Sequence, residues 1–336
     1  MRTSDFDYSL PEELIAQRPI AKRDQSRLLV VDRCRELIEH RRFRDIPDYL
    51  REGDLLVMND TRVSAVRLHG RKGTGGQAEA LLLRRLEPGV WEAMVKPGRR
   101  VPVGTKLFFD GGLEAAVVDR TSAGGRILRF GAGDEADQVI GRTGEVPLPP
   151  YIRERIEDPG RYQTVYAAAE GSAAAPTAGL HFTPDLLDRI QAKGVKTAFV
   201  TLHVGVATFR PVRTENVEDH EMHSEEVEVS PQAAETINSA TGRIVCVGTT
   251  TARALESAAT GRRKVAPMRG QTKLFITPPY DFRVVEGLIT NFHTPRSTLL
   301  MLVSAFAGIG LVRRAYEEAV RERYAFLSFG DAMFLH

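Results

Sequence analysis

The sequence contains very little cysteine, and this excludes two ways of holding a fold together. Cys34 and Cys246 are its only thiols among 336 residues. Two thiols cannot build a disulfide framework or a zinc ribbon. Each lies in or near an apolar run, so we expect both to be buried. A chain of this length has room for about two domains and a sizeable core.

The sequence also lacks a long apolar run and a leader pattern. The first residues, MRTSDFDYSLPEEL, contain no apolar segment of the kind found in signal peptides. The most apolar run, residues 298–312, is interrupted by Ser304 and by glycines. It is short for a bilayer, so we expect it to be a buried helix. These features predict a cytoplasmic protein that does not contact a membrane.

Glycine motifs for phosphate binding are missing as well. No Walker A sequence is present, and no G-x-G-x-x-G follows a predicted strand. The nearest feature is VCVGTTTARALES, residues 245–257, where a predicted strand runs directly into a helix. The N–H groups of that helix start and the hydroxyls of Thr249, Thr250 and Thr251 are able to hold a carboxylate or a phosphate. Ordinary capping by a threonine explains the same residues.

The pattern of predicted elements changes twice along the chain. Apolar strand-like runs alternate with helical segments before residue 61 and again after residue 150, which is typical of α/β folds. Between Arg62 and Gly144, six short strand-like segments follow one another and are separated by glycine-rich turns. We therefore predict a mixed α/β fold with an inserted small β-barrel. The predicted large domain is residues 1–61 and 150–336, and the predicted barrel domain is residues 62–149.

Elements within the large domain follow from the same patterns. A short helix is expected from Ser9 to Gln17, and two helices are expected between Thr298 and Tyr324. The segments predicted as strands are residues 26–33, 36–43, 53–60, 196–203, 224–230, 243–250, 272–277 and 284–292.

One stretch, RYQTVYAAAEGSAAAPTAGLHFT at residues 161–183, combines small residues with polar and aromatic ones. Glycine and proline there exclude a long helix, and tyrosine, histidine and phenylalanine are unlike a flexible linker. We predict an ordered loop whose small residues let a ligand approach the backbone. Its polar side chains are predicted to point into a pocket.

Three histidines, His181, His203 and His293, lie at the ends of apolar strand-like or loop segments. A lone histidine of this kind is usually a structural residue, but three at element ends favour a shared cleft. The sequence Asn59-Asp60-Thr61-Arg62 likewise ends a buried strand at the domain junction. Junctions are common ligand sites, although a turn fixed by Asn and Asp explains these residues too.

The acidic segment EDHEMHSEE, residues 218–226, allows several interpretations. His220, His223 and Glu225 suggest a partial metal site, but the His-Glu-x-x-His signature is missing and no third ligand stands at a fixed spacing. A solvated acidic turn is the simplest interpretation. A histidine tuned by a carboxylate for acid–base chemistry lies between these two.

The predicted barrel contains a group of basic residues, with Trp91 inside it and Tyr151 just beyond. This composition suits a surface for single-stranded nucleic acid, and it equally suits solvated strand faces. The basic residues are Arg84, Arg85, Lys96, Arg99, Arg100 and Lys106.

Long stretches resemble one enzyme family in the right order and almost from end to end. They include SLPEELIAQRP, GDLLVMNDTRV, DPGRYQTVYA, GSAAAPTAGLHFT, VTLHVGVATFRPV, VGTTTARALES and LITNFHTPRSTLLMLVSAFAG. The chain is similar there to the S-adenosylmethionine:tRNA ribosyltransferase-isomerases of queuosine biosynthesis. The resemblance is weakest in the barrel segment, and it implies the fold that the element pattern predicts.

The resemblance implies a transferase-isomerase acting on RNA. Such an enzyme moves the ribosyl part of S-adenosylmethionine onto the aminomethyl group of 7-aminomethyl-7-deazaguanine at the tRNA wobble position. Epoxyqueuosine forms, and adenine and methionine leave. S-adenosylmethionine is then a consumed substrate, and neither a resident cofactor nor a metal is expected. The implied partners are S-adenosylmethionine and the tRNA anticodon stem-loop, which the barrel would help to hold, and we expect a monomer.

That chemistry needs a base for the ribose carbon beside the sulfonium and an acid for the departing adenine. Histidines suit both roles because they titrate near neutrality. The catalytic candidates are His181, His203, His223 and His293, with Glu225 and Asp60 as carboxylate partners.

The same resemblance suggests which residues bind the substrates. A sulfonium needs acidic or aromatic surroundings, which Tyr162, Tyr166 and Phe182 are candidates to supply. The methionine carboxylate is expected at Thr249, Thr250 and Thr251 or at Arg253. The remaining candidates, for base and ribose contacts, are Asn59, Arg62, Arg161, Gln163, Thr177 and Asn291.

Two functions from other classes stay open at the level of sequence. One is a metal-dependent hydrolase that uses His220, His223 and Glu225. The other is a non-catalytic RNA-binding protein.

Overall fold

The structure, a computed structural model, describes residues 1–122, 124–131, 133–205 and 212–336. Residues 206–211, which belong to the stretch VTLHVGVATFRPV, lie outside the described part. Contacts divide the chain into two compact units. The larger unit comprises residues 1–61, 149–169 and 175–336, and the smaller unit comprises residues 62–148 and 170–174.

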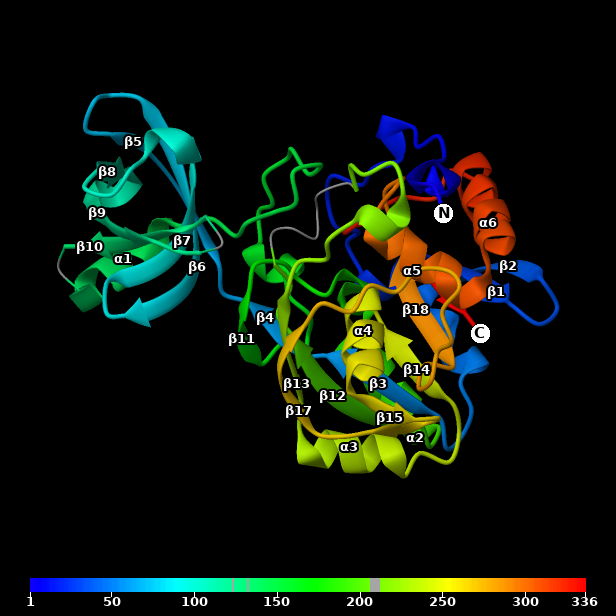
Figure 1. The fold of residues 1–336 in the computed structure, drawn as a ribbon. Coiled ribbons are helices and arrows are strands. Elements are labelled where there is room, and N and C mark those ends of the chain that lie inside the picture. The colour runs from blue at the N-terminus through cyan, green and yellow to red at the C-terminus, as the bar shows by residue number, and fades with distance from the viewer. Residues whose placement is uncertain (123, 132, 206–211) are drawn as a thin grey trace. The chain divides into compact units, whose positions relative to one another are not determined.

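The larger unit is built on a nine-stranded sheet, in the order β17-β13-β12-β3-β14-β18-β19-β1-β2 (Figure 1). Its centre is formed by parallel strands β12 (Lys196–Leu202), β3 (Leu55–Asn59), β14 (Ile244–Val247) and β18 (Gly287–Asn291). Every residue of β3, β14 and β18 is buried, as expected for parallel strands covered on both faces. The carboxyl ends of all four strands therefore lie along one edge of the sheet.

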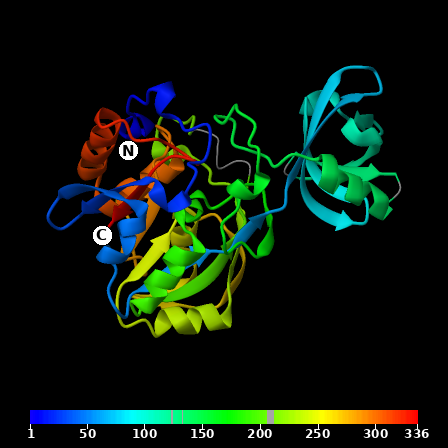
Figure 2. The same cartoon turned by 180° about the vertical axis from the view of Figure 1, so that it is seen from behind.

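Antiparallel strands extend this centre on both sides. On one side lie β13 (Glu225–Val229) and β17 (Met268–Thr272). On the other side β19 (Ala332–Leu335) pairs antiparallel with β18 and parallel with β1 (Arg27–Asp32), and β1 forms a hairpin with β2 (Leu37–Arg42). Figure 2 shows this hairpin and the helices of the unit from behind. The helices are α2 (Pro184–Ala192), α3 (Pro231–Asn238), α4 (Thr249–Ala258), α5 (Thr298–Ala307) and α6 (Ile309–Arg321).

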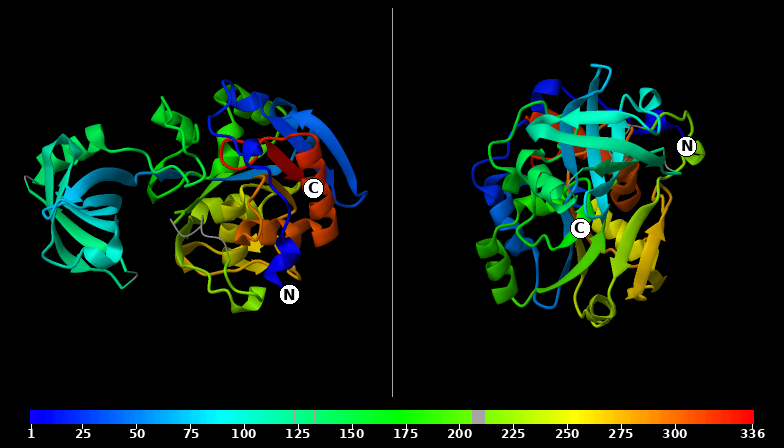
Figure 3. Two further views of the ribbon diagram at one scale, coloured as in Figure 1. Left: turned by 90° about the horizontal axis from the view of Figure 1, so that it is seen from above. Right: turned by 90° about the vertical axis from the view of Figure 1, so that its left-hand side faces the viewer.

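The smaller unit is a closed barrel in the order β10-β7-β6-β5-β8-β9, and Figure 3 shows it in two further views. Closure leaves no exposed strand edge. Helix α1 (Gly133–Thr143) adds Ala136 and Ile140 to the barrel core. The barrel strands are β5 (Val66–Lys72), β6 (Gln77–Glu87), β7 (Val90–Lys96), β8 (Lys106–Phe109), β9 (Leu113–Arg120) and β10 (Arg126–Phe130).

Short elements complete the described chain. The remaining strands pair in twos: β4 (Thr61–Val63) with β11 (Ala169–Ser172), and β15 (Ala259–Gly261) with β16 (Lys264–Val265). The 3-10 turns are η1 (Thr3–Phe6), η2 (Glu12–Leu14), η3 (Arg23–Gln25), η4 (Phe43–Tyr49), η5 (Gly98–Arg100), η6 (Asp110–Gly112), η7 (Pro159–Tyr162), η8 (Thr177–His181) and η10 (Val217–Asp219).

The predicted fold class, an α/β domain with an inserted β-barrel, is confirmed, and so are the six barrel strands. Several local predictions are wrong. The expected helix from Ser9 to Gln17 is only the turn η2, because Leu14 and Ala16 exchange backbone hydrogen bonds with Phe326 (2.8 and 3.3 Å). Residues 272–277 do not form a strand, since β17 ends at Thr272.

Two further expectations concern burial and the apolar run. Cys246 is buried as predicted, but Cys34 is exposed in the β1–β2 turn. The run at residues 298–312 is divided between α5 and α6, because Gly308 adopts a positive φ of 86°. In the described part of the chain, no single helix is long and apolar enough to cross a membrane; α5 and α6 meet that test only together, with a bend of 115° between them.

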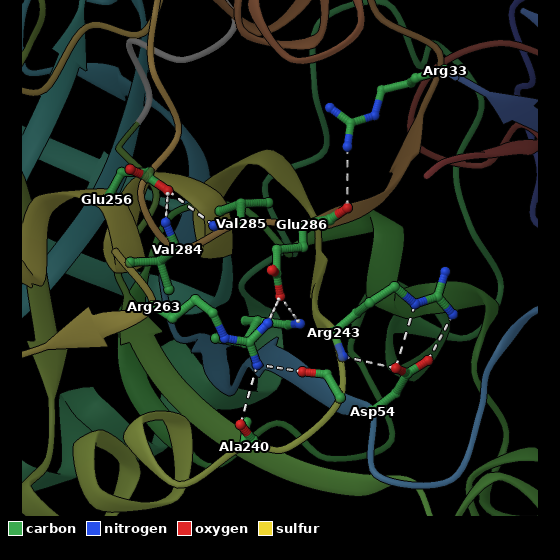
Figure 4. A network of polar contacts seen from close by, with 11 residues as sticks. Arg33, Asp54, Ala240, Arg243, Glu256, Arg263, Val284, Val285 and Glu286 are labelled. Carbon is green, nitrogen blue, oxygen red and sulfur yellow. Dashed lines mark hydrogen bonds and ion pairs between the residues drawn. The ribbon is translucent and has the colours of Figure 1, made fainter. Parts of the chain in front are cut away.

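Carboxylates fasten the segment that leads into β18 (Figure 4). Glu256 of α4 is 6% exposed and accepts hydrogen bonds from the backbone N–H groups of Arg283, Val284 and Val285 at 2.9–3.0 Å. Glu286 then accepts from the Ile244 N–H at 3.0 Å. Through these bonds α4 fixes the point at which β18 enters the sheet beside β14.

Replacing Glu256 by Gln should destabilise the larger unit. The amide NH₂ would meet N–H donors that the carboxylate now accepts from, which should lower the free energy of unfolding by about 1–3 kcal/mol. Urea unfolding measures this change. Glu235→Gln, at an exposed position of α3, is the matched control. Equal stability of the two variants would contradict the expectation.

Candidate active site

Polar residues gather where the central parallel strands end. β3 runs into Asn59 and Asp60, β12 is followed by His203, and β18 ends at Asn291. β14 is followed by Gly248, whose positive φ of 92° turns the chain directly into α4. Ligands of open sheets bind at the carboxyl ends of parallel strands. This edge of the larger unit is therefore its candidate active site.

Asn59 ties the strand ends together. Its Nδ2 donates to the Leu202 carbonyl (2.9 Å) and to Thr250 Oγ1 (3.2 Å). Its Oδ1 accepts from the N–H groups of Thr61 and Leu202, both at 3.1 Å. Thr251 Oγ1 in turn donates to the Val247 carbonyl at 2.6 Å. These bonds give Asn59, Thr250 and Thr251 a framework role, holding β3, β12 and the start of α4 in register.

His203 combines a neutral ring with a free ring nitrogen. Its Nδ1 lies 2.7 Å from Thr61 Oγ1, and Thr61 also donates to the Ala169 carbonyl (3.5 Å). Thr61 thus engages Nδ1, and Nε2 has no hydrogen-bond partner among the described residues. Burial lowers the pKa of His203, while Glu226 and Asp60 oppose that shift. The ring is thus uncharged near neutrality, and Nε2 is its open nitrogen.

Asp60 is one of the carboxylates whose charge acts on this histidine, after Glu226. Its Oδ1 accepts from Thr201 Oγ1 at 2.7 Å. Burial raises the pKa of Asp60, and the hydrogen bond from Thr201 and the charge of His203 act in the opposite direction. An acid with a raised pKa beside a base with a lowered pKa is an arrangement suited to proton transfer.

His181 is held by both of its ring nitrogens. Nδ1 lies 2.8 Å from Ser26 Oγ, and Nε2 lies 3.1 Å from Asn291 Nδ2. Because the Asn291 amide can only donate from Nδ2, Nε2 accepts and Nδ1–H donates. The ring stacks on Phe43 with centroids 4.9 Å apart. Burial, aided by the charge of Arg23, lowers the pKa of His181 to about 3, so the ring is a neutral, fixed spacer.

His293 is fixed in a similar way. Its Nε2 lies 2.8 Å from Thr290 Oγ1, and its backbone N–H donates to the Tyr316 hydroxyl at 3.0 Å. Its carbonyl accepts from the Tyr8 hydroxyl at 2.5 Å. Burial lowers the pKa of His293 to about 3. The predicted histidines therefore differ: only His203 combines partial exposure with an open ring nitrogen.

Tyr166 lies between the residues around His203 and those around His181. Its buried hydroxyl has no hydrogen-bond partner among the described residues, and electrostatically it senses both Asp60 and Arg23. A Cβ at Gly179 would stand 2.1 Å from the Tyr166 oxygen, so only glycine fits there. Burial raises the pKa of Tyr166, which keeps the hydroxyl protonated. Its ring packs on Phe199 with centroids 5.6 Å apart.

An acidic cleft opens beside Asp60. It has a volume of about 330 Å³, and among the residues that line it are Asp60, Phe199, Thr201 and Glu228. Two carboxylates and an aromatic face suit a cation. Tyr166 packs on Phe199, the aromatic residue that lines this cleft.

Glu225 and Arg253 form a buried ion pair. Glu225 is 7% exposed and Arg253 is 5% exposed. Arg253 Nε donates to the Leu274 carbonyl at 3.2 Å, and its Nη2 is buried without a partner among the described residues. Glu225 thus pairs with an arginine and not with His223, whose ring is exposed.

The other predicted residues have varied surroundings. Phe182 is fully buried and lies edge-on to Phe43, and Tyr162 is buried edge-on to Phe329. Thr177 begins η8, and Gln163 follows η7. Arg62 is exposed and belongs to the smaller unit.

Arg23 and Ser26 at the site were not predicted, and Thr61 was noted only as part of the junction sequence Asn59-Asp60-Thr61-Arg62. Thr61 and Ser26 are hydrogen-bond partners of His203 and His181, and Arg23 lies beside His181 in a small pocket. Only the polar run RDQSR before β1 hinted at the first two.

No group of three or more His, Cys, Asp and Glu side chains in the described residues is placed to hold a metal ion. His220 packs edge-on against Phe275, with centroids 5.5 Å apart, and Glu225 is engaged by Arg253. The set proposed for a hydrolase is therefore not assembled.

Comparison with known proteins decides between the candidate functions. A family model described as "Queuosine biosynthesis protein" matches residues 3–335. The chain belongs to this family. Curated members named S-adenosylmethionine:tRNA ribosyltransferase-isomerase come from Symbiobacterium thermophilum (55% identical), Desulforamulus reducens (52%) and Moorella thermoacetica (54%). Each match covers 100% of this chain and 100% of the relative.

A solved member of the queuosine family has the same architecture. The crystal structure of S-adenosylmethionine tRNA ribosyltransferase from Thermotoga maritima is 42% identical, with a TM-score of 0.57. The match covers 99% of this chain and 100% of that one. The family and the class of enzyme predicted from the sequence are confirmed, and neither the hydrolase nor the non-catalytic RNA-binding protein is favoured.

The buried histidines His181 and His293 should make the folded protein less stable in acid. Their folded pKa of about 3 lies below the ordinary value of 6.5, so only the unfolded chain takes up these protons between those values. Stability is then complete above about pH 6.5 and falls as the pH falls towards 3, by roughly 2 kcal/mol per histidine at pH 5.

Unfolding of His293→Gln at pH 7.5 and pH 5.0 tests this expectation. The loss of stability between the two pH values should shrink by about 2 kcal/mol relative to the unaltered chain. The exposed His223→Gln is the control and should leave the loss in place. An equal loss in His293→Gln and the unaltered chain would show that His293 already takes up its proton in the folded state.

Proposed function

We propose that this chain transfers the ribosyl moiety of S-adenosylmethionine to the aminomethyl group of 7-aminomethyl-7-deazaguanine at the tRNA wobble position. Epoxyqueuosine forms, and adenine and methionine are released. The observation that carries the proposal is the family match over residues 3–335, with relatives of that enzyme name at 51–55% identity over the full length. The edge of the central strands supplies groups for each chemical demand.

His203 is the proposed general base. It takes the proton from the ribose carbon beside the sulfonium onto Nε2, the ring nitrogen that Thr61 leaves free. The imidazolium that results is stabilised by Asp60 and Glu226, the carboxylates that already raise the pKa of His203 against the effect of burial. His181, whose two ring nitrogens are hydrogen-bonded, and His293, whose Nε2 lies against Thr290, act as positioning residues for Asn291 and the turn after β18.

Asp60 and the acidic cleft are proposed to hold the cationic part of S-adenosylmethionine. Asp60 and Glu228 attract the sulfonium, and Phe199 offers an aromatic face that Tyr166 supports. Asp60 stays ionised in this role, so the imidazolium of His203, which carries the proton taken from the ribose carbon, is the proposed proton donor to the departing adenine.

Arg253 is the proposed contact for the methionine carboxylate. Its unpartnered Nη2 lies at the second turn of α4, whose first residues are Thr249, Thr250 and Thr251. Glu225 keeps the guanidinium in place. A carboxylate there would satisfy the buried Nη2 and interact with the positive end of the α4 dipole.

His203→Gln tests the proposed base. The amide still reaches Thr61 but does not accept a proton, so single-turnover adenine release should fall about 100-fold or more. Affinity for S-adenosylmethionine should change little. In the unaltered chain, the rate should fall as acid protonates His203, at a pH below 6.5 because burial lowers its pKa. Exposed His40→Gln on the edge strand β2 is the control, and a near-normal rate in His203→Gln would remove His203 from the mechanism.

The barrel is proposed to hold the anticodon stem-loop. Arg126 is 6% exposed, and its guanidinium donates to the carbonyls of Val101 and Gly98 at 2.8 and 2.6 Å. These bonds fix η5, which presents Arg99 and Arg100 to solvent. The two have no acidic partner among the described residues. The other predicted basic residues pair with acids of the barrel unit: Arg84 with Glu92, Arg85 with Asp134 and Asp137, Lys96 with Glu79, and Lys106 with Glu114.

We also propose that residues 62–149 fold as a domain inserted in residues 1–61 and 150–336. A closed barrel with its own core supports this division. The family's reaction spends S-adenosylmethionine, so we propose no resident cofactor. We further propose that the chain works as a monomer in the cytoplasm.

The double variant Arg99→Ala/Arg100→Ala should bind an anticodon stem-loop more weakly. Each phosphate contact that is lost should reduce the slope of log affinity against log salt by about 0.7–0.9. Titrations of labelled RNA at several salt concentrations measure both quantities. Arg84→Ala/Lys106→Ala removes the same charge from paired positions and should have little effect. If Arg99→Ala/Arg100→Ala keeps the original affinity and slope, the RNA does not bind η5.

A further inference from the structure

Two arginines of the larger unit each hydrogen-bond to the chain segment that contains the other. We call this arrangement the clasp. Arg23 in η3 and Arg161 in η7 each donate to backbone carbonyls of the other's neighbourhood. The carbonyls that accept from Arg23 belong to Gly160 (3.0 Å), Gln163 (2.7 Å) and Leu180 (3.3 Å), and those that accept from Arg161 belong to Ile20 (2.5 Å) and Ala21 (3.1 Å). The clasp joins the segment before β1 to the loop that carries His181.

The clasp brings two positive charges together. After burial, the charge of Arg161 is the main influence that lowers the pKa of Arg23. Neither guanidinium has a carboxylate hydrogen-bond partner among the described residues, and Arg161 Nε is buried without a partner. Asp158 partly offsets the charge of Arg23, but its Oδ1 accepts from the Gly160 N–H at 2.8 Å. Two like charges held this closely are destabilising unless an anion joins them.

Both arginines line a small pocket. Leu180, His181, Ser328 and Gly330 also line it, and no acidic side chain does so in the described part of the chain. The cavity of about 20 Å³ has room for about one water-sized atom, so a larger anion would place a single oxygen in it. His181 is neutral there, so the two guanidiniums are the charges that the pocket presents. A planar guanidinium fork matches the oxygens of a phosphate or a carboxylate.

We propose that Arg23 and Arg161 bind one substrate oxyanion in this pocket. The proposal rests on the proposed function, in which Arg253 already holds the methionine carboxylate, so the oxyanion is a phosphodiester of the tRNA loop. The anion neutralises the clasp and steadies the backbone on either side of it. Because Leu180 is one of the clasped residues, occupancy of the pocket also holds His181 and, through it, Asn291.

Arg161→Gln tests the site, because the amide keeps a donor for the backbone carbonyls and removes the charge. Equilibrium binding of an anticodon stem-loop and of S-adenosylmethionine is measured separately, and thermal unfolding verifies the fold. For a phosphodiester, the dissociation constant of the stem-loop should rise about 10-fold or more and the salt slope should fall by about one. A loss of affinity for S-adenosylmethionine in place of the stem-loop would show that the pocket holds the methionine carboxylate, and it would overturn the assignment to the tRNA.

The control is Arg18→Gln, which makes the same change of charge in the segment before β1 that contains Arg23. Arg18 is exposed and pairs with Glu154, outside the pocket. Arg18→Gln should leave both affinities unchanged. If a folded Arg161→Gln binds both substrates as the unaltered chain does, the oxyanion site is refuted.

A measurement on the unaltered protein covers the case in which Arg161→Gln fails to fold. Inorganic phosphate, replacing chloride at constant ionic strength, should weaken the binding of the stem-loop. Absence of competition with either substrate would refute the site. These are binding measurements, so failure of the proposed function would look different: both substrates would bind and no adenine would be released.

Discussion

The amide of Asn59 holds together the edge on which the site depends. Its Nδ2 and its Oδ1 each make two hydrogen bonds. The partners belong to the ends of β3 and β12 and to the first turn of α4. The amide is fully buried, so a missing partner would leave an unsatisfied polar group in the core. The order of the strand ends therefore follows from one side chain. Asp60 and Thr61, the next residues, are placed by the same bonds, and through Thr61 so is His203.

The histidines at this edge divide into fixed and reactive members because of their hydrogen bonds, not because of their position along the strands. His181 has a partner on each ring nitrogen and lies among apolar side chains. His203 has one partner and stays half-buried among carboxylates. Burial lowers the pKa of both, but only His203 keeps an open ring nitrogen for a substrate. The hydrogen bonds therefore fix His181 and leave His203 as the histidine that can exchange a proton with a substrate.

Periodicity predicted much of the architecture. Buried parallel strands such as β3 and β14 are short apolar runs between turn residues, and the barrel strands are separated by glycine turns, so both were found from local pattern. Strand β19 was missed, and the helix at Ser9 was wrong, because distant residues decide both. β19 exists through its pairing with β1 and β18, and Phe326 takes the backbone bonds that a helix at Leu14 would need. Helix α1 was not predicted, although Ala136 and Ile140 have the spacing of one helical face.

Prediction of the site from sequence was less complete. Histidine and asparagine at strand ends indicated one edge of the sheet, and the structure brings Asn59, His203 and Asn291 to that edge. At Gly179 the close neighbour is the Tyr166 hydroxyl of the protein itself. Residue type did not reveal which ring nitrogens were already occupied. Ser26 and Arg23 were missed, and Thr61 was given no role of its own, because the roles of all three come from partners more than a hundred residues away in the chain.

The position of β19 in the sheet has a consequence for synthesis on the ribosome. β1 and β2 are among the first strands to be made, yet β1 joins the sheet only through β19, residues 332–335. While the chain is growing, the β1–β2 hairpin has no neighbour in the described sheet until β19 is made. Completion of the sheet therefore waits for the last strand, and a nascent chain of this protein has an unpaired edge that a chaperone could bind.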